Sequence, residues 1–409
     1  MNKNIKLAVA GAVLALSASA NAGIIIPAGE WTLDVNGNVN AFANFIKADH
    51  ASTNTITGGM ALNKDATGEK NTQGINTGLL PSWLGFTGKT RQNDVDVEFT
   101  ISMQPSVSAS GAAGDGAGPL WRQNYVSFGD KSWGSIKLGK DIGIFASNAI
   151  LNDMTLLGVG NAVGAATGSN GNTTHGGIGT GYIYAAWKGQ IAYTTPNFNG
   201  FQATVGLTNP NQGLDGTQTN NTAGGNAIFQ DRFGLEGQAT YSFAGDALNG
   251  KVWAGGASYK VKQLAASSLY TESTSSVADL GANVNFGAVG LTGYYYTGEG
   301  VGTTVMFGQS HTTTGQKRDS DGGYLQATYT LPIKTKIGLA YGKSSLDLAS
   351  GETAGSSFVK HNKRMTVGAY HPLTKHLNLV AEFNDIEAEA HSGVKLEHTS
   401  VSTGAILFF

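Results

Sequence analysis

Apolar and polar residues alternate along most of the chain, in segments of about ten residues. The segment 95–102 reads VDVEFTIS, and the segment 377–384 reads LNLVAEFN. A period of two predicts β-strands, because successive side chains of a strand point to opposite faces. One face is apolar and the other is polar, often charged. A soluble β-sandwich has the same alternation, so the period predicts strands without deciding whether the fold is soluble.

The pattern predicts sixteen strands, each near the length that a tilted membrane strand needs. They are placed at 30–46, 81–88, 92–102, 121–129, 133–140, 189–195, 200–208, 231–243, 250–260, 277–286, 288–298, 321–330, 334–344, 362–371, 376–388 and 396–408. Seven short connections alternate with eight long polar loops. The short ones are 89–91, 130–132, 196–199, 244–249, 287, 331–333 and 372–375.

The sorting of these connections separates the two kinds of fold. Short turns on one side and long loops on the other are typical of a bacterial outer-membrane barrel, with both termini on the periplasmic, short-turn side. Sixteen antiparallel strands leave a water-filled channel. We therefore predict an all-β fold, a 16-stranded antiparallel transmembrane β-barrel lined by the polar face of each strand.

The first 22 residues are expected to be a secretory signal peptide. Lys3 and Lys6 precede a short apolar run at 7–16, and Ala20-Asn21-Ala22 has the small-x-small form of a cleavage site. The run is too short to span about 30 Å of hydrocarbon. The barrel is then expected at 23–409. No later apolar run reaches the length of a membrane-spanning helix, so a closed barrel is the form in which this chain enters a membrane.

The composition excludes several other classes of protein. Charged residues make up only 13% of the chain, yet the mean hydropathy is −0.12, because Gly, Asn, Thr, Ser and Gln supply the polarity. The net charge is −2 with no block of Lys and Arg, so no nucleic-acid partner is expected. Cys is absent, which excludes disulfides and thiolate metal sites. The eight His are scattered, and no metal or cofactor is expected.

Four motifs, in order along the chain, resemble those of the Gram-negative general porin family, in its neisserial and proteobacterial branch. The segment 122–128, RQNYVSF, followed by 133–140, WGSIKLGK, looks like that family's R-x-x-Y-V-G-L…G-x-x-x-L-G-R hairpin. The segment 191–201, IAYTTPNFNGF, is similar to its Y-x-S-P-x-F-x-G-F turn. The segment 370–375, YHPLTK, resembles its Y-x-L-S-K turn, and Phe409 resembles its terminal aromatic assembly signal.

The resemblance implies a homotrimer of barrels in the outer membrane that lets ions and small hydrophilic solutes diffuse passively. It implies contact with outer-membrane lipid and lipopolysaccharide. It also implies that the third long loop folds inward to narrow the pore. Here that loop, about 141–188, is the longest, and it opens with a short helical turn carrying Asp141 and Asp153 at its ends.

Opposed charges in the pore are expected to set a transverse field. Asp141 and Asp153 on the loop are expected to face Arg122 and Lys137 on the wall. The alternation along its strand directs Lys137 toward the lumen. It directs Arg122 outward unless a bulge intervenes, so Arg122 is included through the resemblance. Lys140 stands where the family has an Arg, and completes the expected constriction.

Other residues are expected to line the pore away from its narrowest part. Trp83, if it faces inward, is either a platform on which solutes stack or a subunit-packing residue. The alternation also directs several charged side chains toward the lumen, namely Asp96, Glu98, Arg232, Glu236, Arg364 and Glu382.

Two other functions stay open at this point. A channel selective for sugars or carboxylates is compatible with the long third loop and with Trp83 and Thr87, where the family often has basic residues. An adhesin or structural barrel would do its work through its loops. An enzyme is not expected, because the chain has no G-x-S-x-G motif and no convincing His-Ser-acid set.

Overall fold

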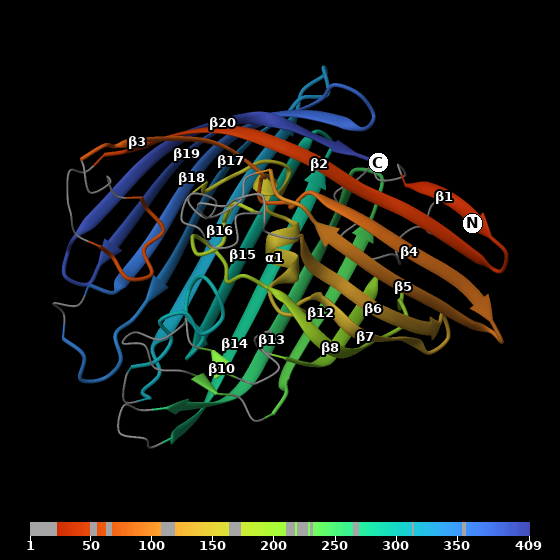
Figure 1. Ribbon diagram of the computed structural model, residues 1–409, viewed down its shortest axis with the longest axis horizontal. Coiled ribbons are helices and arrows are strands. Elements are labelled where there is room, and N and C mark those ends of the chain that lie inside the picture. Colours follow the sequence, from red (N-terminus) through yellow and green to blue (C-terminus); the bar gives the residue numbers. More distant parts are fainter. Residues whose placement is uncertain are drawn as a thin grey trace.

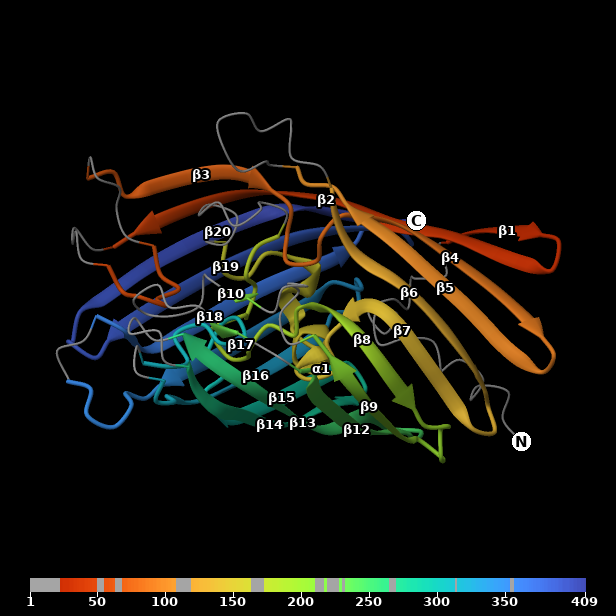
Figure 2. The ribbon, with the colours of Figure 1, turned by 60° about the horizontal axis from the view of Figure 1, so that its bottom comes forward.

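A single antiparallel sheet closes on itself to form a barrel, with helix α1 inside the ring of strands in both views (Figures 1 and 2). The computed structural model describes residues 23–49, 55–62, 68–107, 119–162, 173–209, 217–218, 228–229, 232–264, 270–312, 315–353 and 357–409. The sheet closes because β2 (Trp31–Ala48) pairs with β20 (Lys395–Phe408) on one edge and with β4 (Trp83–Gln92) on the other. The expected signal peptide, 1–22, lies outside the described residues.

The barrel wall has sixteen strand positions, so the predicted fold class is confirmed. Between β4 and β20 the wall strands are β5 (Val95–Gln104), β6 (Leu120–Asp130), β7 (Gly134–Ile142), β8 (Trp187–Thr194), β9 (Phe201–Thr208), β12 (Gly234–Ala244), β13 (Leu248–Leu264), β14 (Tyr270–Phe286), β15 (Val289–Glu299), β16 (Asp319–Thr330), β17 (Lys336–Leu346), β18 (Val359–Pro372) and β19 (Leu377–Ala390).

Four short strands extend wall positions rather than add new ones. β1 (Ile24–Ala28) pairs with the start of β2 on the side where β20 has already ended, and β3 (Asn71–Asn76) shares the other edge of β2 with β4. β11 (Ile228–Phe229) pairs with β13 beyond the end of β12, and β10 (Thr217–Gln218) pairs with β11. The sequence pattern does not predict β1 and β3, because each is shorter than the alternating segments of about ten residues from which strands were predicted.

The period-two pattern decides which way each strand faces. On β19, Leu379 and Phe383 point outward and are 41% and 40% exposed, whereas Glu382 points inward and is buried. A row of exposed apolar side chains is what a lipid-facing wall requires, since lipid rather than water covers it. The polar positions therefore face the lumen, as the alternation predicted.

The first turn after β4 differs from the prediction. Lys89 and Arg91, expected in a turn at 89–91, lie within β4, where they form ion pairs with Glu98 and Asp96 of β5. The turn is at Asn93 and Asp94, whose φ angles are +49° and +63°. Two-residue hairpin turns need positive φ, which Asn and Asp tolerate better than most residues. Charged side chains are typical of surface turns, but in a barrel they can also lie on strands and face the lumen.

Two connections expected to be long are short. β13 runs to Leu264 and β14 starts at Tyr270, while β19 ends at Ala390 and β20 starts at Lys395. These strands continue past the apolar belt into a polar rim, where alternation of polar residues with other polar residues gives no pattern to follow.

Among the described residues, helical structure lies only in the connection between β7 and β8. It holds α1 (Ser147–Leu151) and a 3-10 turn at Met154–Leu157, in agreement with the helical turn expected there. Among the described residues, no helix has the length and apolar character needed to cross a membrane.

Candidate pore constriction

The described residues 143–162 and 173–186, here called the β7–β8 segment, contact inward-facing side chains of strands across the barrel. The first contact is at Glu236 on β12, whose Oε2 accepts a hydrogen bond of 2.9 Å from the backbone N–H of Phe145. The other carboxylate oxygen accepts bonds from Lys188 Nζ at 2.7 Å and Tyr259 OH at 2.8 Å. Thr208 Oγ1 donates a further bond of 3.0 Å. The buried carboxylate is thereby fully paired, as a charge removed from water must be.

A second contact holds the later part of the segment against β19. Glu382 Oε2 accepts hydrogen bonds from the backbone N–H groups of Val159 and Gly160, at 3.0 and 2.7 Å. Its other oxygen accepts a bond of 2.7 Å from Tyr370 OH of β18. A Cβ at Gly158 would overlap the same carboxylate, so glycine lets the backbone approach it without displacing the side chain. The segment is therefore fixed to the wall at two carboxylates from different strands.

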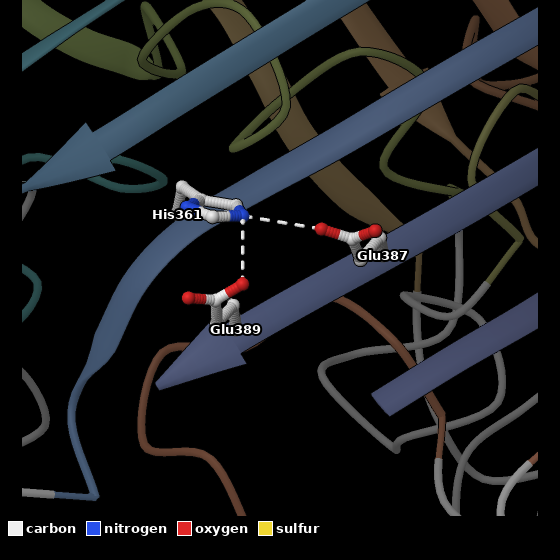
Figure 3. Close-up of side chains that lie close together, drawn as sticks. All are labelled: His361, Glu387 and Glu389. Carbon is white, nitrogen blue, oxygen red and sulfur yellow. Dashed lines mark hydrogen bonds and ion pairs between the residues drawn. The ribbon is translucent and has the colours of Figure 1, made fainter. Parts of the chain in front are cut away.

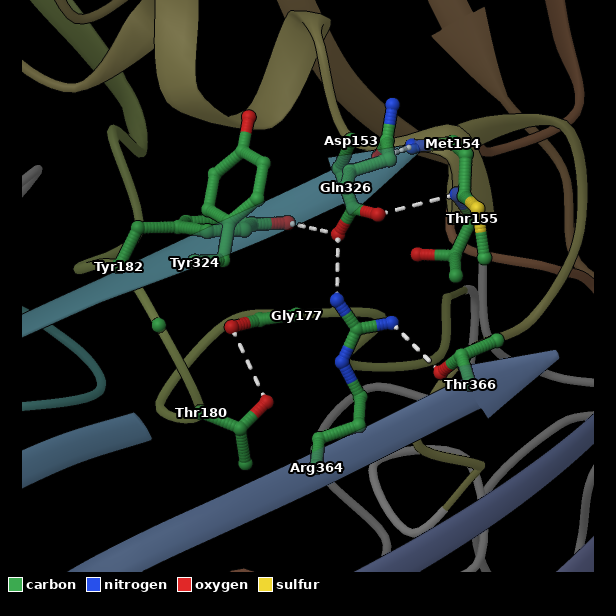
Figure 4. A network of polar contacts seen from close by, with 12 residues as sticks. Asp153, Met154, Thr155, Gly177, Thr180, Tyr182, Tyr324, Gln326, Arg364 and Thr366 are labelled. Carbon is green, nitrogen blue, oxygen red and sulfur yellow. Dashed lines mark hydrogen bonds and ion pairs between the residues drawn. The ribbon is translucent and has the colours of Figure 1, made fainter. Parts of the chain in front are cut away.

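Between these points, Asp153 forms the polar network drawn in Figure 4. Its Oδ2 lies 3.3 Å from the Arg364 guanidinium of β18 and accepts a bond of 3.0 Å from Tyr182 OH. Its Oδ1 accepts a bond of 3.0 Å from the N–H of Thr155, which caps the 3-10 turn. Burial, with the negative charge of Asp153 next in importance, raises the pKa of the Tyr182 phenol well above its usual range, so this hydroxyl remains a donor.

The face of the segment that lies against the wall is apolar and aromatic. Phe145, Ala149 and Ile150 belong to one buried cluster with inward-facing aromatic residues of β13, β15 and β16. The Tyr324 ring packs edge-on against Tyr182 at 5.8 Å, and its OH donates a 2.8 Å bond to the carbonyl of Ala149. The wall aromatic residues of this cluster are Trp253, Tyr259, Tyr294, Tyr296 and Tyr324. The cluster explains why this part of the chain is rich in apolar residues although it lies outside the strands.

The wall strands β5 to β7 carry a separate polar group. Asp141 lies on β7 rather than in a loop, and it forms an ion pair with Lys137, four residues earlier on the same face of the strand. Gln123 Nε2 donates to Asp141 Oδ1 at 3.2 Å, and the Lys137 ammonium lies 4.6 Å from the centre of the Tyr125 ring. Tyr125 OH in turn donates to Glu98 at 3.3 Å. Asp141 and Lys137 thus neutralise each other on one strand.

Arg122 occupies a β-bulge. Met103 pairs with Trp121 and Ser102 pairs with Gln123, so Arg122 is the extra residue that the bulge inserts into the ladder. Arg122 is buried, and its guanidinium lies 5.8 Å from the ring of Trp187. The bulge removes the outward parity that the alternation assigned to this residue.

The other expected pore residues fall into three groups. Lys140 lies on the face of β7 opposite to Lys137 and Asp141, so the structure places it on the outer side of the wall. Trp83, the first residue of β4, faces inward beside the last strand, its ring 6.3 Å from that of Phe408. Arg232 is exposed just before β12.

The remaining acidic residues pair within the wall. Asp96 and Glu98 form ion pairs of 2.8 and 3.3 Å with Arg91 and Lys89 of the neighbouring strand. The structure therefore brings Asp153 together with Arg364, and Asp141 with Lys137, instead of opposing both acids to Arg122 and Lys137. Sequence reasoning missed Lys188, although it has the same parity as the inward-facing Gln190 of β8.

We expect the connection between β15 and β16 to loosen in acid. His311 in this connection is buried, with its ring nitrogens 2.7 and 3.1 Å from the hydroxyls of Ser310 and Ser273. Burial, with the nearby charges of Lys317 and Arg318, lowers its pKa to about 4. Below a pH of about 6.5 the open connection binds a proton that the closed one does not, so the closed form loses stability as the pH falls toward 4.

Hydrogen exchange of residues 300–312 at pH 7 and pH 5, corrected for the intrinsic rates, measures this effect. Protection should fall at pH 5 in the unmodified protein and stay constant in H311Q. Equal protection at both pH values in the unmodified protein would contradict the prediction.

The family model for Gram-negative porins matches residues 7–391. The fold is similar to the outer membrane channel DcaP of Acinetobacter baumannii, at 16% identity and a TM-score of 0.70, covering 95% of this chain and 100% of that one. No curated protein sequence matches this chain.

Two further solved structures have the same fold. An anion-selective porin from Comamonas acidovorans is 19% identical, with a TM-score of 0.61 and coverage of 93% and 100%. Salmonella typhi OmpF in complex with daunomycin is 15% identical, with a TM-score of 0.56 and coverage of 94% and 100%. At these identities the likeness concerns the fold.

Proposed function

Because the chain belongs to the Gram-negative porin family and is an outer-membrane channel for passive diffusion, we propose that the β7–β8 segment forms its constriction. The family and its fold are typically those of channels without enzymatic activity. The segment is held by Glu236, Arg364 and Glu382, which come from three different wall strands. Because these contacts lie inside the wall, the segment occupies part of the bore that sixteen strands would otherwise leave open.

The charges of the lumen favour general diffusion over selection by charge. Each of the acids Asp141, Asp153 and Glu236 has a basic partner within ion-pair distance, and the pairs lie on the wall or at its junction with the segment. Paired charges produce a weak field at a distance, since their contributions cancel. A water-filled opening with a weak field admits small hydrophilic solutes mainly by size.

One residue favours the alternative, a channel for solutes that carry a carboxylate. Lys251 faces inward on β13, where its ammonium donates a 3.3 Å hydrogen bond to Asn148 of α1. Among the described residues, no carboxylate lies within ion-pair distance of this ammonium. The unpaired Lys251 ammonium beside the constriction would attract solutes that carry a negative charge, such as carboxylates.

We also propose that the barrel works as a homotrimer in contact with outer-membrane lipid and lipopolysaccharide. Oligomerisation is supported by a structural relative of 11% identity and TM-score 0.53, a Vibrio cholerae OmpT described as a trimer form. An apolar outer wall is compatible with both a lipid and a subunit neighbour, and its exposed residues include Val367, Phe383 and Leu325.

Planar-bilayer recording of the refolded protein in a salt gradient tests this function. We expect conductance steps in multiples of three and a reversal potential close to zero, because Asp141, Asp153 and Glu236 each have a basic partner. Liposome swelling with neutral, cationic and anionic solutes of one size should then give similar rates. Faster entry of carboxylates, lost in K251Q, would favour the selective alternative. Folded protein without conductance steps would contradict both channel readings.

A further inference from the structure

A band of charged side chains lies on the outer face of the barrel, at the end that carries the long connections. In the register of β17, β18 and β19, Lys343 lies directly opposite Lys363, which lies opposite Glu387. Two residues along each strand from the lysines, Tyr341 and Met365 point outward and are 49% and 38% exposed. The lysines thus lie about 7 Å beyond the edge of the apolar belt.

Three acidic and basic side chains next to this pair form a compact network (Figure 3). His361 Nε2 lies 3.1 Å from Glu387 Oε1 and 3.7 Å from Glu389 Oε2. Lys363 and Lys395 form ion pairs with these two carboxylates, at 2.6 and 3.1 Å. A His and two carboxylates are ligands that a divalent metal accepts, but here ammonium groups already neutralise both acids. The network is therefore better suited to fix the positions of its lysines than to hold a metal.

Lys343 differs from Lys260 and Lys317, two other lysines at this end of the barrel. Lys260 pairs with Glu272 and Lys317 pairs with Glu299, whereas no carboxylate of the described part of the chain lies within ion-pair distance of Lys343. Two like charges directly opposite each other on a sheet face repel. An anion between the two ammonium groups would remove this repulsion.

We propose that Lys343 and Lys363 bind a phosphate group of an outer-leaflet lipid. The two ammonium groups face away from the barrel at the level where lipid head groups begin, just beyond the exposed apolar belt. Basic side chains at this level attract anionic head groups, and their long stems reach along the apolar surface toward them. The carboxylates of the network leave Lys343 free to contact the phosphate, while Glu387 fixes Lys363.

This inference rests on the proposed function in one respect, that lipid covers the outer face. It adds the chemical group that is bound and the two residues that bind it. It does not depend on which solutes pass the pore, so conductance and lipid binding report on the two proposals separately.

Native mass spectrometry of the full-length protein in detergent, with diphosphorylated lipid A and its dephosphorylated form as probes, tests the proposal. We expect K343Q and K363Q each to weaken binding of the phosphorylated lipid about fivefold, and the double variant about thirtyfold. K260Q, which removes a paired lysine on the rim at β13, is the matched control and should bind normally. K343R should also retain binding.

Three outcomes would overturn the proposal. The first is equal binding of the phosphorylated and dephosphorylated lipids. The second is inorganic phosphate binding alone as tightly as the lipid, which would make the pair a site for free anions. The third is a changed oligomer size in the double variant, which would make this face a subunit contact. Conductance and the heat-dependent gel mobility of the folded barrel establish that each variant is folded.

Discussion

Replacing Glu236 with alanine is expected to lower the free energy of unfolding of the barrel by about 3–5 kcal/mol. Glu236 and Lys188 are both completely buried, and their charged atoms lie 2.7 Å apart. Removing the carboxylate leaves the Lys188 ammonium buried without a counter-charge, and removes the acceptor for Tyr259 OH and the N–H of Phe145. The cost arises because the ammonium cannot be rehydrated where it lies.

Denaturant unfolding of the protein folded in detergent micelles measures this loss. E98A is the matched control, because Glu98 forms a half-exposed pair with Lys89, and such pairs contribute about 1 kcal/mol or less. Replacing both members of the buried pair, as E236L with K188M, should recover much of the stability, since apolar residues of similar volume often substitute for a buried pair. An unfolding midpoint of E236A equal to that of E98A would contradict the prediction.

The barrel could be predicted from the sequence because its main determinant is local. A period of two, interrupted by turn residues, assigns each strand and each face without knowledge of the partner strand. The prediction failed where that signal is absent, in the short strand 71–76 and in the polar continuations of β13 and β19 beyond the apolar belt. At Lys89 and Arg91 a charged pair in the lumen resembled a turn.

The alternation of faces along a strand also indicates which of the expected pore residues can face the lumen together. Lys140 is three residues from Lys137, so strict alternation already places the two on opposite faces. Alternation gives Arg122 an outward face unless a bulge intervenes, but an alternating pattern does not show where an extra residue enters the ladder. Its position became visible only in the pairing of β5 with β6.

The partners of the β7–β8 segment could not be predicted for a different reason. Asp153 and Arg364 are 211 residues apart, and the contact depends on the path of a connection across the barrel. No periodic pattern encodes that path. Asp153 lies at the start of the 3-10 turn, and its carboxylate pairs with Arg364 of β18 rather than with Lys137.

Replacing Glu382 with alanine is expected to release the later part of the β7–β8 segment while the barrel stays folded. The carboxylate accepts two backbone bonds, from Val159 and Gly160, and one from Tyr370 OH. Leaving these donors without an acceptor costs on the order of 1 kcal/mol each, so the population of the detached segment should rise about a hundredfold. The ladder of β19 is made of backbone bonds and does not depend on this side chain.

Single-channel recording detects the released segment as frequent current fluctuations between sub-states, because a mobile segment changes the free cross-section of the pore. D385A is the matched control, since Asp385 lies three residues farther along β19 on the outward face and is exposed. Its channel should be as quiet as that of the unmodified protein. A quiet E382A channel with unchanged conductance would show that the segment does not limit the current, and the constriction would have to be sought along the wall strands β4 to β7 instead.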